Sequence, residues 1–467
     1  MEAVLHLFSH RRYQVLGTAW LAWFVNYIDR TKTAALLPLI IASLGMTTRE
    51  TGQVLFWFFL GYACVQPFAG FFTDLIGPKK MLAVTIGAFS VFTWTMAFVS
   101  NWHELALRNL LFGIAQGFEV TAGSRLTATW FPPATRGRAF AFHQTAYTIA
   151  PILVPFIVVP IAQITGSWRW SFLVVAFFGL PILAAINRFI VDRPERDPKI
   201  TRAELDVIFG EAELRRKHGE VTDPARAHRL EELPPGERIT PYSEIFANRN
   251  VALMFGAGFF FLLASWGLTT WLPTYGVQQL KLPLLVAGSL SSISYLGALC
   301  GVLLSGVLSD LVLKTKRTPI WLLGGLLMAA TIGWASTFRQ GVPIGLAYLA
   351  FFIAGFGASW TPTGTLFAPY LAEILTPGAV GRSLGVVVLG GMLGSTVAQP
   401  LTAAMVVQTP AGPDFHRAFL MFATCGVLGF LCCAGLIEPR VRRTYLGYLV
   451  SGGREGTWQP TSPIPAA

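Results

Sequence analysis

The feature that most constrains the fold is a series of twelve apolar runs, each long enough to cross a lipid bilayer. About 20 mostly apolar residues span the hydrocarbon layer as a helix. Inside that layer every backbone polar group needs a partner within the protein, which only helices and closed barrels provide. We therefore predict an all-α membrane protein with twelve transmembrane helices. The runs are residues 14–38, 52–74, 81–100, 105–128, 138–163, 170–190, 251–274, 285–307, 319–338, 344–372, 382–406 and 416–438.

The charges support this class, because only 13% of the residues are charged, whereas soluble domains carry about 25%. The net charge of +11 does not indicate nucleic-acid binding, since the basic residues stand between apolar runs. Alternate loops carry most of them, which predicts an inner- or plasma-membrane protein, embedded in lipid, with both termini in the cytoplasm. These positions are Arg11, Arg12, Lys79, Lys80, Arg136, Arg138, Lys314, Lys316, Arg317, Arg382, Arg440, Arg442 and Arg443.

A polar segment of mixed charge, about residues 191–250, divides the runs into two sets of six. Within it, residues 201–217 place apolar residues at helical spacing, which predicts a short surface helix. We expect an N-terminal six-helix half (1–190), a cytoplasmic linker (191–250) and a C-terminal six-helix half (251–440). The remaining 441–467, rich in Gly, Pro and Ser near its end, is expected to be a largely disordered cytoplasmic tail.

The two halves are related by an internal repeat. Six residues between positions 60 and 75 recur between positions 296 and 311, which is 236 residues later. Both copies end an apolar run at a basic loop. Two related halves that rock around a central site are the plan of many secondary transporters. The matching residues are Leu60, Gly61, Cys64, Gly70, Asp74 and Leu75, with Leu296, Gly297, Cys300, Gly306, Asp310 and Leu311.

The first run contains the charged neighbours Asp29 and Arg30. A charged side chain at the centre of a membrane helix costs about 3 kcal/mol on insertion scales, so such residues usually face a partner or a cavity and serve function. Adjacent residues of a helix point about 100° apart, so the two need not pair with each other. We expect this position to mark the substrate and proton path, with a permanent structural ion pair as the alternative.

The loop after the second run has the pattern Gly70-x-x-x-Asp74-x-x-Gly77-x-Lys79. This pattern resembles the loop signature of the major facilitator superfamily, which implies the major facilitator fold. Gly70 is expected to let two helix ends approach closely, and Asp74 to hold a helix terminus or a basic partner in one state. Asp310 stands in the looser second copy. These residues are expected to act in gating, not in substrate binding.

Within that superfamily the chain is similar to the anion:cation symporters, which include sugar-acid and other organic-anion porters. The resemblance implies that Arg30 binds the substrate carboxylate, which the guanidinium fork fits. It also implies that Asp29 carries a proton, and that Tyr27, Tyr62 and, more loosely, Gln144 lie near substrate. The motifs are Asn26-Tyr27-Ile28-Asp29-Arg30, Ala128-Thr129-Trp130-Phe131-Pro132-Pro133, Ser167-Trp168-Arg169-Trp170-Ser171-Phe172, Arg193-Pro194-Glu195 and Trp271-Leu272-Pro273-Thr274-Tyr275.

The fourth run departs from the family pattern. Relative to Gly113, the usual glutamate position holds Gln116, which cannot titrate. Glu119 follows three residues later and so lies on nearly the same helix face. We predict that Glu119 takes over the proton role or that Asp29 carries it alone. The alternative is that Glu119 pairs with Arg125 or Arg30.

Polar and aromatic residues in two runs of the second half complete the predicted site. Both runs are interrupted by Gly or Pro, and broken membrane helices often build substrate sites. Ser359 and Trp360 also resemble the hydroxyl and aromatic contacts of the family. The residues predicted to touch substrate here are Trp271, Tyr275, Ser359, Trp360 and Thr363.

These patterns predict a secondary active transporter that takes up a small organic anion with protons, acts as a monomer and needs no cofactor or metal. An enzyme is not expected, since the sequence has no His-Glu-x-x-His motif and no Gly-rich phosphate loop. A proton-coupled drug or metabolite antiporter or exporter of the same superfamily is the alternative. The fifth run lacks the Gly-Pro-x-x-Gly-Gly-like stretch of many antiporters. A sensor that binds without transport is a further alternative.

Overall fold

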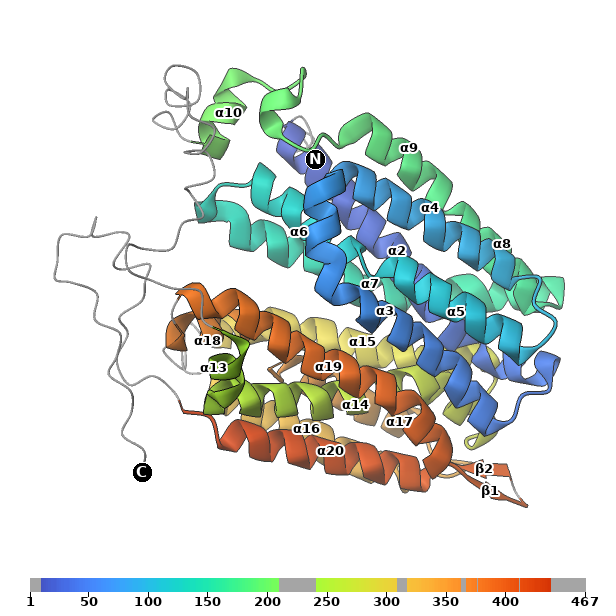
Figure 1. The fold of residues 1–467 in the computed structure, drawn as a ribbon. Coiled ribbons are helices and arrows are strands. Elements are labelled where there is room, and N and C mark those ends of the chain that lie inside the picture. The colour runs from blue at the N-terminus through green and yellow to red at the C-terminus, as the bar shows by residue number, and fades with distance from the viewer. Residues whose placement is uncertain are drawn as a thin grey trace.

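The computed structural model contains two bundles of helices that lie side by side, shown in Figure 1 from blue to green and from yellow-green to red. It describes residues 10–209, 241–308, 317–362, 367–375, 377–410 and 412–437. Each bundle buries its own hydrophobic core, centred on residues such as Trp130 and Phe172 in the first and Trp321 and Phe351 in the second. The predicted all-α fold of two halves is therefore confirmed.

The helices of the first bundle are α2 (Arg11–Leu44), α3 (Thr48–Ile76), α4 (Pro78–Met96), α5 (Trp102–Gln116), α6 (Glu119–Trp130), α7 (Pro133–Thr165), α8 (Trp168–Phe177) and α9 (Gly179–Phe189). Between the bundles lie η1 (Pro194–Arg196), α10 (Arg202–Phe209) and α13 (Tyr242–Ala247). The second bundle comprises α14 (Arg249–Gln278), α15 (Leu284–Val307), α16 (Thr318–Ala335), α17 (Ile344–Ser359), α18 (Phe367–Ile374), α19 (Pro377–Met405), the hairpin β1 (Val407–Thr409) and β2 (Gly412–Asp414), and α20 (His416–Ala434).

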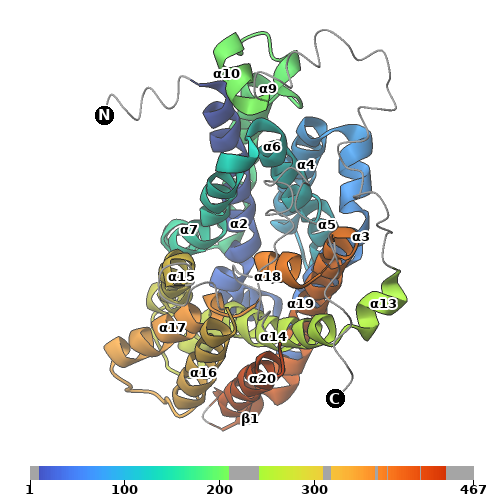
Figure 2. The ribbon, with the colours of Figure 1, turned by 90° about the vertical axis from the view of Figure 1, so that its left-hand side faces the viewer.

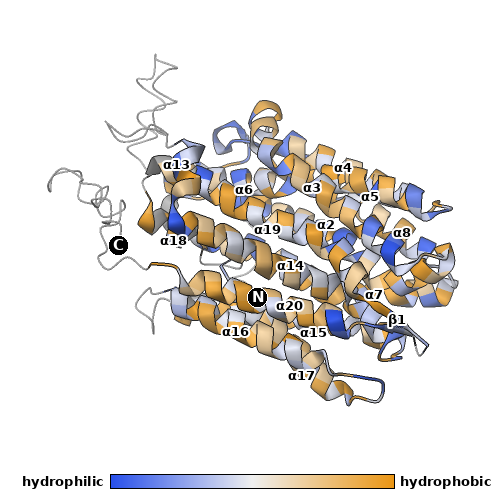
Figure 3. Ribbon diagram, turned by 60° about the horizontal axis from the view of Figure 1, so that its bottom comes forward, coloured by the Kyte–Doolittle hydropathy of each residue, from blue (hydrophilic) through white to orange (hydrophobic). Residues whose placement is uncertain are grey.

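Each of the twelve predicted runs falls on one of these helices or on a consecutive pair. Within the described ranges, eight helical segments are long and apolar enough to cross a membrane by length and composition. The first run, on α2, carries buried charges, and the fourth and tenth are broken into α5–α6 and α17–α18. Figure 3 shows hydrophobic residues along the helices and hydrophilic residues gathered toward their ends, as a membrane protein requires.

The internal repeat corresponds to the same close packing in both bundles. A Cβ on Gly61 would overlap the Leu110 carbonyl oxygen, so α3 and α5 touch backbone to backbone. The repeated residue Gly297 stands in the same relation to the Phe352 carbonyl oxygen, which brings α15 against α17. Small residues permit such approach in membrane bundles, where packing replaces the hydrophobic effect. The repeat therefore preserves one helix-packing contact in each half.

The linker binds the beginning of α2 through an ion pair and hydrogen bonds. Arg11 forms a buried ion pair of 2.6 Å with Asp197. The Glu204 carboxylate, on α10, accepts hydrogen bonds from the backbone N–H groups of Arg11 and Arg12, at 3.1 and 2.8 Å. These are donors that the first turn of a helix leaves unsatisfied. We call this end of the molecule the linker end. It faces the viewer in Figure 2, where α10 and α6 are labelled.

Part of the predicted organisation lies beyond what the structure describes. The predicted surface helix at 201–217 coincides with α10 over Arg202–Phe209, and residues 210–240 lie outside the described residues. The whole predicted tail, 441–467, does so as well. The domain limits at 191–250 and 441 stay predictions.

The bundles meet at the opposite end, which we call the hairpin end after β1 and β2. Gln408 donates a hydrogen bond of 2.8 Å to the Thr48 hydroxyl across the two bundles. A Cβ on Gly52 would lie 2.6 Å from that of Ala403, so α3 and α19 are in close contact there. A Cβ on Gly288 would lie 2.9 Å from the Pro155 side chain, which brings α15 against α7. This conformation is therefore closed toward the hairpin end.

Candidate functional site

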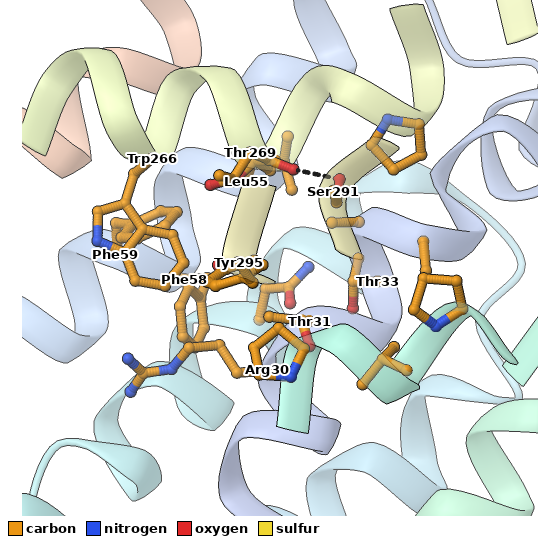
Figure 4. Close-up of a pocket in the computed structure, with 18 of the residues that line it drawn as sticks. Arg30, Thr31, Thr33, Leu55, Phe58, Phe59, Trp266, Thr269, Ser291 and Tyr295 are labelled. Carbon is orange, nitrogen blue, oxygen red and sulfur yellow. Dashed lines mark hydrogen bonds between the residues drawn. The ribbon is translucent and has the colours of Figure 1, made fainter. Parts of the chain in front are cut away.

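Arg30 lies near the middle of α2, and its guanidinium points out of the first bundle among four aromatic rings. The guanidinium carbon is 4.3 Å from the ring centre of Tyr62, 4.8 Å from that of Tyr27 and 5.5 Å from that of Phe58. On its other side, the same guanidinium carbon is 6.0 Å from the ring centre of Trp266, which belongs to α14 of the second bundle. Cations over aromatic faces are attracted electrostatically within about this distance. Arg30 therefore stands where the two bundles meet (Figure 4).

The hydrogen bonds of Arg30 leave one terminal nitrogen without an acceptor. Nε donates to the Gln116 side-chain oxygen at 3.1 Å, and Nη1 to the Tyr27 hydroxyl at 3.4 Å. Nη2 is buried and has no hydrogen-bond partner among the described residues. A buried donor without an acceptor is costly, more so when it is charged. The site is thus prepared to receive an anion at this nitrogen.

Asp29 does not share this site. Its carboxylate lies inside the first bundle, 2.6 Å from the Lys32 ammonium. Both carboxylate oxygens also accept from the Thr93 hydroxyl, at 2.7 and 2.9 Å. The ammonium in turn lies 4.5 Å from the ring centre of Phe112 and 4.6 Å from that of Phe172. Lys32 is the residue that the sequence reasoning overlooked, although its spacing of three residues from Asp29 was the available signal.

Glu119 is buried at the first turn of α6, just after the break that separates it from α5. Neither of its carboxylate oxygens has a hydrogen-bond partner among the described residues. The alternative partner Arg125 instead forms an ion pair of 3.2 Å with Asp74. The charge of Arg30 is the favourable electrostatic influence on this carboxylate. Glu119 is therefore a buried acid close to Arg30 and without an ion-pair partner in the described structure.

A cavity of about 40 Å³ lies between the bundles beside Arg30. Pockets that bind small molecules measure about 300–1,000 Å³, so this space is much smaller than a ligand pocket. Helices α2, α3, α5 and α7 of the first bundle and α14 and α15 of the second line it. Figure 4 shows Phe58, Phe59, Trp266 and Tyr295 gathered near Arg30. An organic anion needs more room, so binding requires the two bundles to open around the cavity.

The predicted substrate residues of the first bundle differ in how close they lie to this cavity. Tyr27 and Tyr62 contact Arg30 as described above. Gln144 is exposed on α7. Tyr147 and Pro151 follow it by three and seven residues and therefore lie on the same face of the helix. Gln144 does not line the cavity.

The residues predicted on the seventh run lie on its far face. Trp271 donates a hydrogen bond of 3.1 Å to Gln399 inside the second bundle, and Tyr275 packs among phenylalanine rings of the same core, 4.6 Å from Phe419. The cavity is instead lined by Trp266, Thr269, Thr270 and Pro273. Five residues along a helix correspond to a rotation of about 140°, so Trp266 and Trp271 cannot face the same space.

The residues predicted on the tenth run serve packing in this conformation. The Trp360 indole donates a hydrogen bond of 2.8 Å to the Gly301 carbonyl, which joins the end of α17 to α15. The Ser359 hydroxyl donates to the Phe356 carbonyl of its own helix at 2.8 Å. Neither residue lines the cavity. Thr363 lies outside the described residues.

The loop signature holds two contacts at the linker end. Asp74 forms the ion pair with Arg125 on α6. Gly77 adopts a φ of 91°, a conformation that favours glycine, and ends α3 directly before α4. The backbone N–H of Lys79 then donates to the Asp192 carboxylate at 2.7 Å. The signature thus ties α3 and α4 to α6 and to the segment after α9.

Two other predicted gating positions behave differently. A Cβ on Gly70 would meet no atom within 4 Å among the described residues. Within the described part of the chain, the close approach predicted at Gly70 is therefore not made in this conformation. Asp310 lies outside the described residues.

The comparisons with known proteins agree with this architecture. Residues 19–398 match the family model described as Major Facilitator Superfamily. The chain belongs to this superfamily. It is therefore a multi-pass membrane transporter and not an enzyme, as the sequence motifs predicted.

Curated relatives and solved structures cover nearly the whole chain. The chain is 26% identical over 457 residues to the "Probable galactarate/D-glucarate transporter GarP" of Escherichia coli (strain K12), with 94% of this chain and 97% of the relative covered. It is 28% identical over 435 residues to the "D-galactonate transporter" of Escherichia coli O6:H1, with 91% and 95% covered. The inward-open xylose transporter XylE from E. coli shares the fold, with a TM-score of 0.68, 17% identity and 94% and 99% coverage.

Proposed function

We propose that this superfamily member takes up a small organic anion together with protons, by alternating access. The observation that carries the proposal is the Arg30 guanidinium, which lies between the two bundles with a buried donor that has no partner. A guanidinium presents a rigid fork of donors that matches a carboxylate and stays charged at physiological pH. The names of the sugar-acid transporters among the relatives support a carboxylate as the ligand.

Substrate binding on this proposal engages Arg30 together with Tyr27 and Tyr62, whose rings already hold the guanidinium. The cavity beside Arg30 is lined from both bundles, so an anion there touches both halves. Rocking of the bundles then exposes it to one side of the membrane at a time. The present conformation is closed at the hairpin end. With both termini in the cytoplasm, it corresponds to an inward-facing state.

Proton coupling on this proposal rests on Glu119 more than on Asp29. Glu119 is buried near Arg30 and has no ion-pair partner in the described structure. When ionised, it attracts the Arg30 guanidinium and so competes with a bound carboxylate; when protonated, it leaves Arg30 to the substrate. Asp29 is instead held by Lys32 and Thr93. An anion and a proton therefore favour each other at this site.

The first test is uptake into proteoliposomes under an imposed pH gradient, screened over aldonates, uronates, dicarboxylates and aromatic acids. Acid outside should drive accumulation of at least one anion, and collapse of the gradient should abolish it. If no anion accumulates, the proposal is wrong. Accumulation with the opposite gradient dependence would instead indicate proton antiport.

Two variants test the residues. Arg30→Lys keeps the charge but loses the fork, and should weaken substrate binding about tenfold or more, because one charge-assisted hydrogen bond is worth about 1.5 kcal/mol or more. Arg108→Lys is the matched control, since Arg108 pairs with Glu104 in a partly exposed position. Glu119→Gln should preserve substrate binding but uncouple uptake from the pH gradient, with Glu104→Gln as its control. Unchanged proton-coupled uptake by Glu119→Gln would rule out the role of Glu119.

A further inference from the structure

The walls of the cavity beside Arg30 differ from what a polyhydroxylated ligand needs. Five aromatic residues line it, and Arg30 is the one charged residue among its described lining. We propose that the substrate is a monocarboxylate with a flat, apolar body, of the benzoate class, and not a sugar acid or a diacid. This inference rests on the proposed function and names the substrate class of the same site. The aromatic residues are Phe58, Phe59, Phe112, Trp266 and Tyr295.

The balance of charges limits the substrate to one negative charge. Lys32 is the other buried cation nearby, and its charge is already neutralised by Asp29 at 2.6 Å. Arg30 therefore remains as the cation available to a ligand in the cavity. The second carboxylate of a diacid would be desolvated there without a cation, which is strongly unfavourable. Whenever Glu119 is ionised, it would also repel this second carboxylate.

Three of the six hydroxyl groups in the described lining donate to backbone carbonyls of the protein. Thr31 donates its hydroxyl proton to the Tyr27 carbonyl at 2.7 Å, and Thr269 donates to the Ser265 carbonyl at 2.8 Å. Ser291 donates to the Thr269 carbonyl at 3.0 Å, the contact drawn as a dashed line in Figure 4. A sugar acid carries a hydroxyl on nearly every carbon, and each loses its water on binding. The other three hydroxyls, on Thr33, Thr270 and Tyr295, are fewer than the hydroxyl groups of a sugar acid, so they cannot replace all of that water.

Besides Arg30, one buried side-chain nitrogen of the described lining has no hydrogen-bond partner. The side-chain nitrogen of Asn109 is buried, has no hydrogen-bond partner among the described residues, and belongs to a residue that lines the cavity. It can donate to the second carboxylate oxygen or to one polar substituent of the ligand. A ligand with one carboxylate and at most one further polar group therefore satisfies the buried donors of this site.

The aromatic walls suit a planar ring. Phe59 and Trp266 lie edge to face across the two bundles, with ring centres 5.2 Å apart. They stand on α3 and α14, so opening of the bundles separates them and leaves aromatic surface on either side of the entering ligand. Aromatic pairs attract each other beyond what the burial of their area provides. A carboxylate on Arg30 and a ring between these walls use both features at once.

The test ranks ligands by binding to the purified full chain in detergent, with isothermal titration calorimetry. The ligands are benzoate, 4-hydroxybenzoate, galactonate and glucarate. We expect at least tenfold tighter binding of an aromatic acid than of galactonate, and the weakest binding for glucarate. Equal or tighter binding of galactonate or glucarate would overturn the inference. Uptake into proteoliposomes tests the proposed function separately. Proton-driven accumulation of a sugar acid would support that function and contradict this substrate class.

A variant pair links the ranking to the aromatic wall. Trp266→Leu should weaken aromatic-acid binding about tenfold, since one aromatic contact approaches the 1.4 kcal/mol that corresponds to tenfold, and should change galactonate binding little. Trp94→Leu is the control, because Trp94 is exposed on α4 and away from the cavity. An equal loss of aromatic and sugar-acid binding in Trp266→Leu would contradict the proposed ring contact.

Discussion

The Asp29–Lys32 pair offers the sharpest test of the buried electrostatics. We predict that Asp29→Asn and Lys32→Met are each strongly destabilising, whereas the double variant Asp29→Asn/Lys32→Met recovers most of the loss. The two side chains are 1% and 0% exposed and 2.6 Å apart. Either single change therefore leaves a full charge inside the bundle with no counterion.

The magnitude follows from what each variant leaves behind. Breaking a buried ion pair on one side costs about 3–5 kcal/mol. In Asp29→Asn, the ammonium of Lys32 retains the Asp29 carbonyl at 2.8 Å, the Thr93 hydroxyl at 3.1 Å and two aromatic faces. These contacts place the loss near the lower limit, at about 3 kcal/mol, which is roughly a hundredfold in the folding equilibrium. Lys32→Met leaves a carboxylate with Thr93 alone and should cost more.

The assay is a double-mutant cycle of unfolding free energies, measured by denaturant titration in detergent micelles. A large interaction free energy between the two sites supports the argument. If the losses of the single variants simply add in the double variant, the pair is not a structural unit and the reasoning fails. Uptake by the double variant also tests the proton role predicted for Asp29, because gradient-dependent uptake without this carboxylate would exclude it.

Three further predictions concern the neighbour of Arg30, the cap of α2 and the contact between α3 and α5. Gln116→Glu should place a carboxylate against Arg30 and lower substrate affinity about tenfold at neutral pH, with recovery at acidic pH, in radiolabelled uptake. Glu204→Ala removes the cap on α2 and should cost about 1 kcal/mol, seen as a lower melting temperature with uptake retained. Gly113→Leu should prevent folding because α5 touches the backbone of α3 there, whereas Gly87→Leu, where a Cβ meets nothing within 4 Å, should express normally.

The fold and the central position of Arg30 could be predicted from the sequence. Twelve long apolar runs leave the chain little choice but helices, because lipid offers no partners to the backbone. The cost of a charge in such a run singles out Arg30 for the same reason. The repeat was also visible in the sequence, but the close helix contacts at Gly61 and Gly297 were seen only in the structure.

The partners of each side chain were decided by the tertiary structure. Helical spacing tells which residues share a face, but not which neighbour that face meets. Trp266 and Trp271 stand on one apolar run, and the sequence analysis chose Trp271. Only the placement of α14 against α3 brings Trp266 to the site instead. Glu119 had two possible cationic partners, and the ion pair of Arg125 with Asp74 removed one of them.

The same distinction applies to the charged residues of α2. Sequence alone singled out Asp29 and Arg30 as costly charges, and Lys32, three residues after Asp29, was overlooked. Their division into an internal pair and a free cation depends on Thr93, Phe112 and Phe172, which come from other helices. Buried charges are stabilised by the few groups within about 4 Å, and those groups are brought together only when the bundle packs.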